Sequence, residues 1–362
     1  MIKIKVDLAE RSYPIFVDAG NLRKLGEMYQ LYGLGRKAVV VSDATVDSLY
    51  GKALSAGFKG LGVQLRSIVL PAGEHTKSLR TIENIITEML EYGCDRDSAV
   101  IGFGGGVIGD IAGFAASIFK RGVPFVQVPT TLLAQVDASV GGKTGVNHAL
   151  GKNLIGTFYQ PRLVWMDLEM LKTLPTREIL CGLGEIIKYG VIWDATLLTL
   201  VEENLDKIRS LDRDIVQEIV KRCCEIKAEI VSQDEKEAGL RMILNFGHTV
   251  GHALEAATDY NVLNHGEAVL LGMLAESKIA LAAGHLSAPD FERIHNIIAK
   301  VDLQIDLEGV TVASVVEFIK TDKKRLAGRP RLVLPRAVGE VFVVDNLDRR
   351  TIKKGIAFVL SG

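Results

Sequence analysis

The sequence predicts two domains, a Rossmann-like α/β domain with a parallel sheet over residues 1–175 and a mainly α-helical domain over residues 176–362. Three observations support this prediction. A length of 362 residues allows two hydrophobic cores. The first half alternates short β-branched runs with helical stretches, as strand–helix–strand units do. From Pro175 onward, apolar residues recur every three or four positions, which is typical of helices.

Short apolar runs in the first half predict buried parallel strands. They cover residues 37–41, 63–70, 98–103, 125–128 and 163–166, and residues 1–6 alternate like a further strand. Runs that are apolar throughout are typical of a sheet covered on both faces. Because ligands of such sheets bind beyond the carboxyl ends of the strands, the residues that follow each strand are the first candidates for a cofactor site.

The second half predicts a bundle of helices with one late strand pair. Helices are expected over residues 176–189, 194–200, 215–231, 249–258, 267–283 and 290–300, and strands at 332–334 and 341–344. No Pro- or Ser-rich linker separates the halves, so we expect them to pack tightly with a cleft between them.

The composition is that of an ordinary globular protein, with 48% apolar and 24% charged residues. Lys and Arg number 43 against 44 Asp and Glu, a net charge of -1, which excludes nucleic-acid or membrane-surface binding through bulk charge. The N-terminus carries no signal core, and no apolar run is long enough to span a bilayer. Four cysteines without C-x-x-C spacing indicate reduced thiols in a cytoplasmic protein.

A glycine-rich turn follows the predicted strand at residues 98–103. The run Gly104-Gly105-Gly106-Val107-Ile108-Gly109-Asp110 satisfies the G-x-G-x-x-G pattern that lets backbone approach a pyrophosphate, although the same glycines also suit a plain tight turn. The turn is atypical of a Rossmann site, because no acidic residue ends the next strand, which continues into Thr130 and Thr131. If a dinucleotide binds here, Asp43 and the Gly73–Lys77 loop are candidates to hold its adenosine end.

Isolated lysines stand beside glycines between Asp137 and Asn153. Lys143 and Lys152 in this setting predict a loop that folds close to a ligand and delivers ammonium groups to it, while the alternative is a solvated surface loop. Arg121 is a further cation near a strand start. The apolar neighbours of the lysines favour a loop tucked against the protein; they are Leu150, Leu154, Ile155 and Phe158.

Three of the seven histidines gather in the segments Asn-Phe-Gly-His248-Thr-Val-Gly-His252 and His265-Gly-Glu267. His248 and His252 are four residues apart, so on a helix they project from one face and two imidazoles can serve one metal ion. The alternative is that they are ordinary surface or core histidines.

Glu185 is a candidate carboxylate ligand for the same ion. A Glu–Lys pair at the spacing of Glu185 and Lys188 is usually a surface ion pair, but the flanking isoleucines and glycines predict close packing here. A buried carboxylate requires a partner such as a metal. One Glu and two His would leave positions open for water and substrate, as in a catalytic site. The spacing leaves open which two of the three histidines bind.

Together these segments resemble the 3-dehydroquinate synthase family of sugar-phosphate cyclases, which is related in fold to the glycerol dehydrogenases. The resemblance runs from about Asp43 to Pro335. Ala72 departs from it, because many members have Asp there. The segments that carry it are Pro-Ala-Gly-Glu-His-Thr-Lys77, Gly-Gly-Gly-Val-Ile-Gly-Asp110, Val-Pro-Thr-Thr131, Gly-Gly-Lys-Thr144, Gly-Lys-Asn153, Gly-Glu-Ile-Ile-Lys188, Asn-Phe-Gly-His-Thr-Val-Gly-His252 and His-Gly-Glu267.

The resemblance implies a role for each candidate residue. It implies Zn²⁺, or Co²⁺, on Glu185, His248 and His265, with His252 as a phosphate contact or proton handler. NAD is implied on Asp43, Glu74, Lys77, Gly105, Gly106, Val107, Ile108, Gly109, Asp110, Thr130, Thr131, Lys143, Lys152, Leu171, Lys172 and Thr173. The substrate phosphate is implied on Lys152, Asn153, His252, one of Lys323 and Lys324, and Arg121 of a neighbouring subunit in a homodimer. The substrate's hydroxyls and carboxylate are implied on Asp137, Lys188, Lys227, Glu237, Arg241 and Asn245.

The implied reaction converts 3-deoxy-D-arabino-heptulosonate 7-phosphate, a phosphorylated sugar acid, to 3-dehydroquinate and phosphate in the shikimate pathway. Its steps are transient oxidation by NAD, β-elimination of phosphate, reduction and an intramolecular aldol closure. Three alternatives stay open: a cyclase of the 2-deoxy-scyllo-inosose or valiolone type, a metal-dependent polyol dehydrogenase that consumes NAD, and a non-catalytic nucleotide-binding protein with a structural metal.

Overall fold

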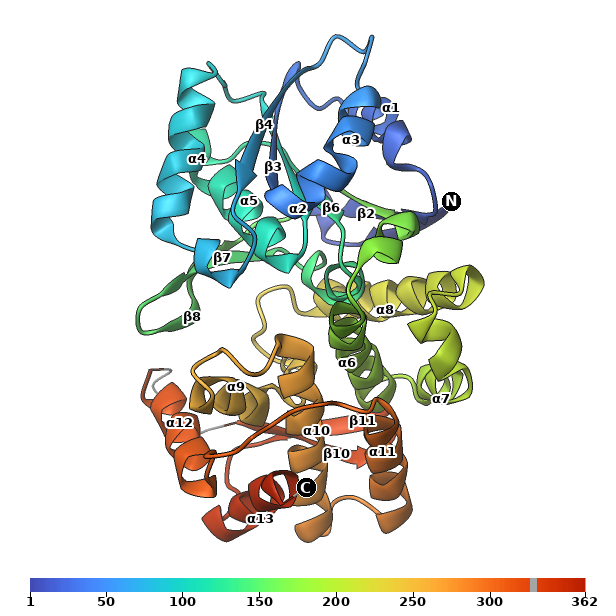
Figure 1. Cartoon of the computed structure of the whole chain (residues 1–362), viewed down its shortest axis with the longest axis vertical. Helices are drawn as coiled ribbons and strands as arrows, with labels where there is room; N and C mark the ends of the chain where they lie inside the picture. The colour runs from blue at the N-terminus through green and yellow to red at the C-terminus, as the bar shows by residue number, and fades with distance from the viewer. Residues whose placement is uncertain (326–330, 362) are drawn as a thin grey trace. The chain divides into compact units, whose positions relative to one another are not determined.

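The chain forms two compact units in the computed structural model (Figure 1). The structure describes residues 1–325 and 331–361, and for residues 321–325 it describes the backbone alone. One unit comprises Met1–Pro175 and Arg213–Lys236, and the other comprises Thr176–Asp212 and Glu237–Gly362. None of the described helices combines the length and apolar character that a bilayer crossing requires.

A seven-stranded sheet forms the centre of the first unit, in the order β1-β2-β9-β6-β5-β3-β4. Every neighbouring pair is parallel except β1 and β2, which confirms the predicted parallel α/β architecture. The strands are β1 (Ile2–Val6), β2 (Tyr13–Asp18), β3 (Lys37–Asp43), β4 (Gln64–Leu70), β5 (Ala99–Gly104), β6 (Phe125–Pro129) and β9 (Leu163–Asp167).

Strand β2 was not predicted. Pro14 lowers the expectation of a strand, because proline cannot donate to a sheet ladder. In the structure Pro14 pairs only with Lys5 of the edge strand β1, and the parallel pairing with β9 begins one residue later, at Ile15. The missing donor therefore does not interrupt the parallel sheet.

Helices cover both faces of this sheet. Val39 and Val41 of β3 belong to the apolar core that includes α4 and α5, whereas Ala38 and Val40 face the core that includes α1 and α3, as the two-residue period of a strand requires. The helices of the unit are α1 (Leu25–Leu31), α2 (Ala44–Val46), α3 (Lys52–Ala56), α4 (Leu79–Glu91), α5 (Gly106–Ile118) and α8 (Arg213–Gln233).

Helix α8 returns to the first unit, although the sequence analysis assigned residues 176–362 to one domain. Its Cys224 Sγ–H donates to the carbonyl of Gln135 at 3.3 Å, and its Lys227 Nζ donates to the backbone and side-chain oxygens of Asp137 at 2.7 and 2.8 Å. Helical periodicity predicts the helix but not the core that its apolar face joins, so this part of the expected domain division is corrected.

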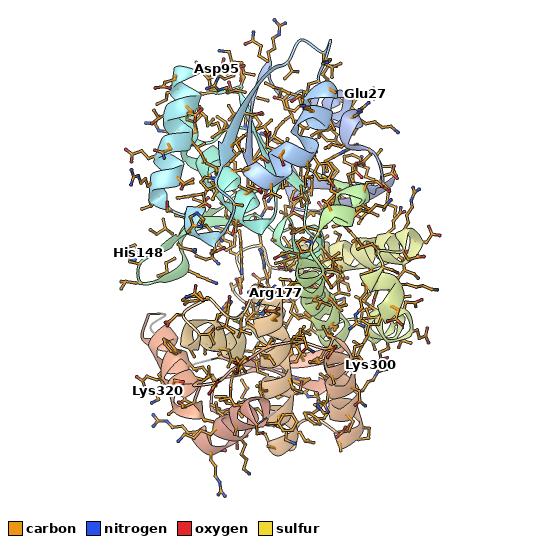
Figure 2. All side chains as sticks on the ribbon, viewed as in Figure 1. Glu27, Asp95, His148, Arg177, Lys300 and Lys320 are labelled. Atoms are coloured by element: carbon orange, nitrogen blue, oxygen red, sulfur yellow. The ribbon has the colours of Figure 1, made fainter. Side chains whose placement is uncertain are left out.

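The lysine-bearing loop is a β-hairpin, β7 (Lys143–His148) and β8 (Gly151–Phe158), with His148 near its tip (Figure 2). The expectation that its apolar side chains are tucked in was wrong for Leu150, Leu154 and Phe158, whereas Ile155 packs against the core that includes α4 and α5. Leu150, Leu154 and Phe158 are 61%, 49% and 42% exposed. Alternate residues of a strand point to opposite sides, so a two-stranded hairpin leaves one set uncovered within a single chain.

The second unit is mainly helical, with one antiparallel strand pair, as predicted. Most residues of helix α10 are buried, and it packs against α6, α9, α11, α13 and β10, which makes it the central helix of this unit (Figure 1). The elements are α6 (Thr176–Ile192), α7 (Ala195–Arg209), α9 (His248–Ala257), α10 (His265–Ala282), α11 (Ala288–Lys300), α12 (Val312–Arg325), α13 (Arg349–Leu360), β10 (Leu332–Ala337) and β11 (Glu340–Val344).

Glycines bring the backbones of α6, α9 and α10 together. A Cβ added at Gly184 of α6 would lie 2.7 Å from the carbonyl oxygen of Gly266 on α10. One added at Gly272 of α10 would lie 1.9 Å from the carbonyl oxygen of Gly247, which precedes α9. These helices therefore approach more closely than any larger residue at these positions would allow.

Gly272→Ala should destabilise the protein strongly, because the methyl group can be accommodated only if α9 and α10 move apart. We expect a loss of about 3 kcal/mol, seen as a lower denaturant midpoint. Gly284→Ala is the control, since Gly284 has φ of +75° but no atom within 4 Å of an added Cβ, and backbone strain alone costs about 1 kcal/mol. Equal effects of the two variants would contradict this account of the helix contact.

Candidate active site

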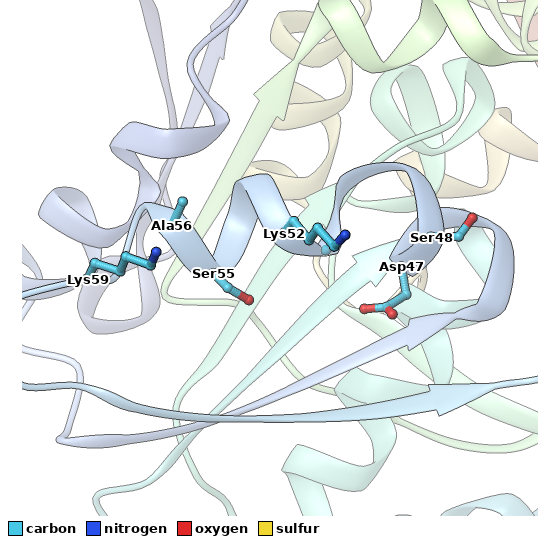
Figure 3. Close-up of a pocket in the computed structure, with 7 residues that line it drawn as sticks. Asp47, Ser48, Lys52, Ser55, Ala56 and Lys59 are labelled. Carbon is cyan, nitrogen blue, oxygen red and sulfur yellow. The ribbon is translucent and has the colours of Figure 1, made fainter.

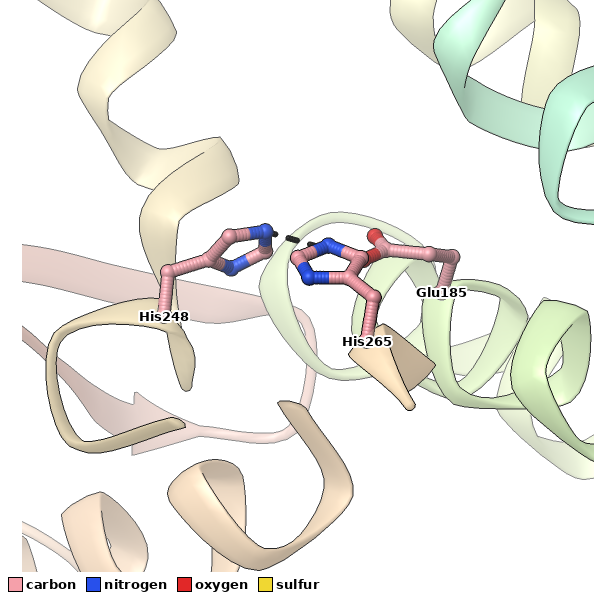
Figure 4. A group of neighbouring side chains, drawn as sticks. All are labelled: Glu185, His248 and His265. Atoms are coloured by element: carbon pink, nitrogen blue, oxygen red, sulfur yellow. Dashed lines mark ion pairs between the residues drawn. The ribbon is translucent and has the colours of Figure 1, made fainter. Parts of the chain in front are cut away.

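Glu185, His248 and His265 converge in the second unit (Figure 4). Glu185 lies in α6, whereas His248 and His265 are the first residues of α9 and α10. The Glu185 Oε1 atom is 3.6 Å from His248 Nε2 and 3.4 Å from His265 Nε2. Glu185 has no exposed surface, so its carboxylate is buried at the meeting point of three helices.

The donor set fits a divalent metal ion. Ligands about 2.0–2.1 Å from a tetrahedral ion are about 3.4 Å from one another, close to the separations of the carboxylate oxygen from the two imidazole nitrogens. Two imidazoles and one carboxylate also leave a position for water or substrate. A second group, His252, Glu255 and His265, likewise has its potential donor atoms within 4.8 Å of one another. His265 is common to both groups.

Contacts on the far side of each ring leave the Nε2 atoms available to an ion. His248 Nδ1 lies 3.1 Å from the carbonyl oxygen of Phe246, an acceptor that favours a proton on Nδ1. His265 Nδ1 lies 3.8 Å from the carboxylate of the buried Glu255. The sequence analysis missed Glu255, whose sequence neighbours give no sign that it faces a histidine of another helix.

The surroundings of the two rings shift their pKa values in opposite directions. Burial lowers the pKa of His248 well below its ordinary value, and the ammonium of Lys188 lowers it further. For His265, burial also acts to lower the pKa, but the carboxylates of Glu185 and Glu255 outweigh it and raise the pKa to about 9. A metal ion must therefore displace a proton from His265 but not from His248.

The start of α10 is held by contacts that the sequence analysis did not identify. Asn264 and Glu267 form a capping box, in which the amide oxygen accepts the Glu267 N–H and the carboxylate accepts the Asn264 N–H. Arg177 of α6 donates from Nε and a terminal nitrogen to the two carboxylate oxygens of Glu267, both at 2.7 Å. The Asn-x-x-Glu spacing could have revealed the cap, but the arginine comes from a distant segment.

Other expected substrate contacts also lie in the second unit. Lys188, only 1% exposed, forms an ion pair with Glu185 one helical turn earlier. Arg241 is buried, and Asn245 donates to the Glu237 carboxylate at 2.5 Å. Glu237 has φ of +60°, a strained conformation of the kind found at functional sites.

The residues expected to bind NAD lie in the first unit, after neighbouring strands of its sheet. Asp43 ends β3, Gly105 and Gly106 follow β5, Thr130 and Thr131 follow β6, and the turn with Leu171, Lys172 and Thr173 follows β9. Strand β3 lies between β4 and β5, so the chain continues from β3 to its neighbour on one side, β4, and then crosses to its neighbour on the other side, β5. The carboxyl ends of β3 and β5 are therefore at a topological switch point, where sheets of this kind bind ligands. Asp43 also caps α2 by accepting the N–H groups of Thr45 and Val46.

Lys77 links a residue expected to bind NAD, Asp110, to one expected to bind the phosphate, Asn153. Its Nζ donates to Asp110 Oδ2 at 2.6 Å and to Asn153 Oδ1 at 2.5 Å, and Lys77 is only 6% exposed. Burial raises the pKa of Asp110, although Lys77 lowers it. Glu74 accepts from the Asn147 side chain at 2.7 Å, and Asn153 has φ of +56°. The loop before α4, the first turns of α5 and the hairpin are thus linked by polar contacts.

The remaining cations are more exposed or lie outside the described side chains. Lys143 begins β7 and is exposed, Lys152 is half-buried on β8, and Arg121 is exposed after α5 with φ of +70°. The side chains of Lys323 and Lys324 lie outside the described residues.

A surface pocket of the first unit is lined by Asp47, Ser48, Gly51, Lys52, Ser55, Ala56 and Lys59, none of them an expected site residue (Figure 3).

Models of protein families match most of the chain. The N-terminal domain of 3-dehydroquinate synthase matches residues 67–181, and its C-terminal domain matches residues 182–325. The chain belongs to the 3-dehydroquinate synthase family. Among family members, the 3-dehydroquinate synthase of Thermodesulfovibrio yellowstonii is 46% identical over 98% of this chain and 99% of its own length. That of Nostoc punctiforme is 45% identical over 97% and 98%.

Solved structures of other sugar-phosphate cyclases share the fold. The 2-epi-5-epi-valiolone synthase of Streptomyces hygroscopicus, solved with NAD⁺ and Zn²⁺, has a TM-score of 0.89 at 30% identity, covering 98% of each chain. A 2-deoxy-scyllo-inosose synthase with carbaglucose-6-phosphate, NAD⁺ and Co²⁺ has a TM-score of 0.89 at 27% identity, covering 98% of this chain and 99% of its own. A probable glycerol dehydrogenase of Sinorhizobium meliloti has a TM-score of 0.66 at 16% identity, covering 96% of each chain, and shows the fold alone.

His248→Ala and His252→Ala should separate the two candidate metal groups. If Glu185, His248 and His265 hold the ion, His248→Ala loses bound zinc and His252→Ala retains it, because each substitution removes a donor from only one group. Zinc content after dialysis, measured by atomic emission, checks this. The reverse pattern would assign the ion to His252, Glu255 and His265.

Proposed function

We propose that this chain converts 3-deoxy-D-arabino-heptulosonate 7-phosphate to 3-dehydroquinate and phosphate, with NAD regenerated in each turnover. The observation that carries the proposal is the match to 3-dehydroquinate synthases at 45–46% identity over nearly the whole length, in a chain where a carboxylate and two imidazoles converge. The similar structures of valiolone and 2-deoxy-scyllo-inosose synthases have lower identities, 30% and 27%, which favours the dehydroquinate reaction.

The donor chemistry of the first unit supports NAD binding. Helix α5 begins at Gly106 with no side-chain cap, and N–H groups at a helix start suit a pyrophosphate. Gly105 packs against Thr131 so closely that an added Cβ would be 3.0 Å from its methyl group. Asp43 and Glu74 offer carboxylate oxygens for ribose hydroxyls. The two cyclase structures that contain NAD⁺ support the same cofactor here.

The proposed metal site consists of Glu185, His248 and His265, and the Zn²⁺ and Co²⁺ of the two cyclase structures support a divalent ion. When bound, NAD exchanges hydride with a carbinol carbon of the substrate, and the metal makes the hydroxyl on that carbon more acidic. The protein's own groups supply the rest. Phe246 and Glu255 hold the imidazoles in the orientation that presents Nε2.

Cations of the chain are proposed to bind the anionic ends of the substrate. Lys152, Asn153, His252 and one of Lys323 and Lys324 would hold the phosphate, which stabilises it as a leaving group. Arg241, with its planar guanidinium, suits the carboxylate. The hydroxyls would be held by Asp137, Lys188, Lys227, Glu237 and Asn245. We assign the role of base in the elimination to an oxygen of the departing phosphate.

A second subunit is proposed to complete the phosphate site. The exposed apolar side chains Leu150, Leu154 and Phe158 suit contact with another copy of the chain. Tyr159, which follows β8, donates its hydroxyl to the Val123 carbonyl at 2.7 Å, so the segment carrying Arg121 packs beside the end of the hairpin. An interface at the hairpin would therefore include Arg121 and could bring it to the partner's substrate.

The reaction assay tests the proposed function. The heptulosonate phosphate is supplied as substrate, with NAD at a much lower concentration. Phosphate should then be released over many turnovers, while the NADH absorbance at 340 nm stays constant because the hydride is returned. Glu185→Gln, which keeps the volume of the side chain but weakens metal binding, should lose both metal and phosphate release. Steady accumulation of NADH without phosphate release would identify a polyol dehydrogenase instead.

Arg121 should act in trans. Heterodimers that combine Arg121→Ala in one subunit with Glu185→Gln in the other should recover about half the wild-type activity, since one of the two sites then has every group intact. Each variant homodimer should be nearly inactive. Differently tagged subunits, co-expressed and purified in tandem, provide the sample. Inactive heterodimers would show that Arg121 serves its own subunit, and a monomeric wild-type protein in sedimentation would reject the dimer.

A further inference from the structure

Glu276 is a buried carboxyl group that the proposed reaction does not use. It lies in α10 and has no exposed surface. Its two oxygens accept backbone N–H groups at the start of α9, from Gly247 at 2.7 Å and from Val250 at 3.3 Å. These groups lack partners inside their own helix, because the first turn of any helix has free N–H donors.

The start of α9 has no cap of its own. Its N-cap residue is Gly247, which has no side chain to accept a hydrogen bond and adopts φ of +79°. An added Cβ at Gly247 would lie 2.5 Å from Met273 Cγ and 2.7 Å from the Val269 carbonyl oxygen, so this turn packs directly on α10. The capping that Ser or Asp usually supplies locally comes here from another helix.

The two anchored N–H groups flank His248. Gly247 precedes it and Val250 follows two residues later, so Glu276 holds the backbone on both sides of this candidate ligand. Helix α10 also begins with His265, about three turns before Glu276. One rigid helix therefore carries one candidate ligand and the group that restrains the backbone of another.

We propose that Glu276 is a positioning residue for the metal site: by fixing the first turn of α9 to α10, it keeps His248 Nε2 directed at the point that His265 Nε2 and Glu185 also face. Glu276 itself touches no donor atom of the site. The inference rests on the proposed metal site at Glu185, His248 and His265. A cap with no other role would contribute stability alone, whereas a positioning residue also sets the affinity for the ion.

The test is a Co²⁺ titration of the chelator-treated, full-length protein, followed by the visible absorption of the bound ion, together with thermal unfolding of the metal-free protein. Glu276→Leu removes both acceptor oxygens at similar volume, and Glu276→Gln keeps one. Asp194→Ala is the matched control, because Asp194 caps α7 of the same unit by accepting the N–H groups of Thr196 and Leu197, and α7 carries no candidate ligand.

We expect Glu276→Leu to raise the Kd for Co²⁺ by about 10- to 100-fold and to change the absorption band, with a smaller increase for Glu276→Gln, as found for groups that orient metal ligands. Asp194→Ala should lower the unfolding temperature with unchanged Kd. If both Glu276 variants keep Kd within about twofold of wild type while unfolding at lower temperature, the role is structural and the proposal is overturned. If Glu276→Leu fails to fold, Glu276→Gln decides.

His248→Ala distinguishes failure of this inference from failure of the metal site. If wild type binds Co²⁺ and His248→Ala does not, the site stands and the Glu276 variants judge the inference alone. If wild type and His248→Ala bind equally, the proposed site is wrong, and the role of Glu276 falls with it.

Discussion

The close contact of α6, α9 and α10 at glycine residues is the constraint on which the candidate metal site depends. Gly184 next to Glu185, Gly266 next to His265 and Gly247 next to His248 each lie against a neighbouring helix where a Cβ would collide with backbone or side chain. Helices separated by ordinary side chains are about 8–10 Å apart, whereas glycines at these contacts let the backbones that carry the three ligands approach more closely. The position of each candidate ligand therefore depends on the glycine beside it in the sequence.

The same packing concentrates charge where water is excluded. A buried carboxylate such as Glu185 costs several kcal/mol unless cations compensate it. Lys188 pairs with it, and the imidazole of His265 lies between Glu185 and Glu255. A divalent ion at this point would add positive charge beside the carboxylate and replace the proton of His265.

Local sequence patterns predicted the strands that end at Asp43 and Gly104, the glycine turn, and the histidine cluster, because each depends on residues near one another in the chain. Patterns of this kind could not predict that α8 joins the first unit, since helical periodicity is silent about which core a helix enters. Nor could they reveal Glu255, Arg177 or Glu276, whose partners lie on other helices. The hairpin with Leu154 and Phe158 was misjudged for a related reason: apolar character predicts that a side chain will be covered, but not by what.

The resemblance to a known family settled what spacing left open, namely which of the three histidines are expected to bind the ion. In the structure, His248 and His265 direct Nε2 atoms toward Glu185, while His252 belongs to a second donor group that shares His265. The most direct test is a crystal of the zinc-loaded protein measured on both sides of the zinc absorption edge. The account predicts one anomalous peak about 2.0–2.2 Å from Glu185, His248 Nε2 and His265 Nε2. A peak coordinated by His252 and Glu255, or none in this unit, would contradict it.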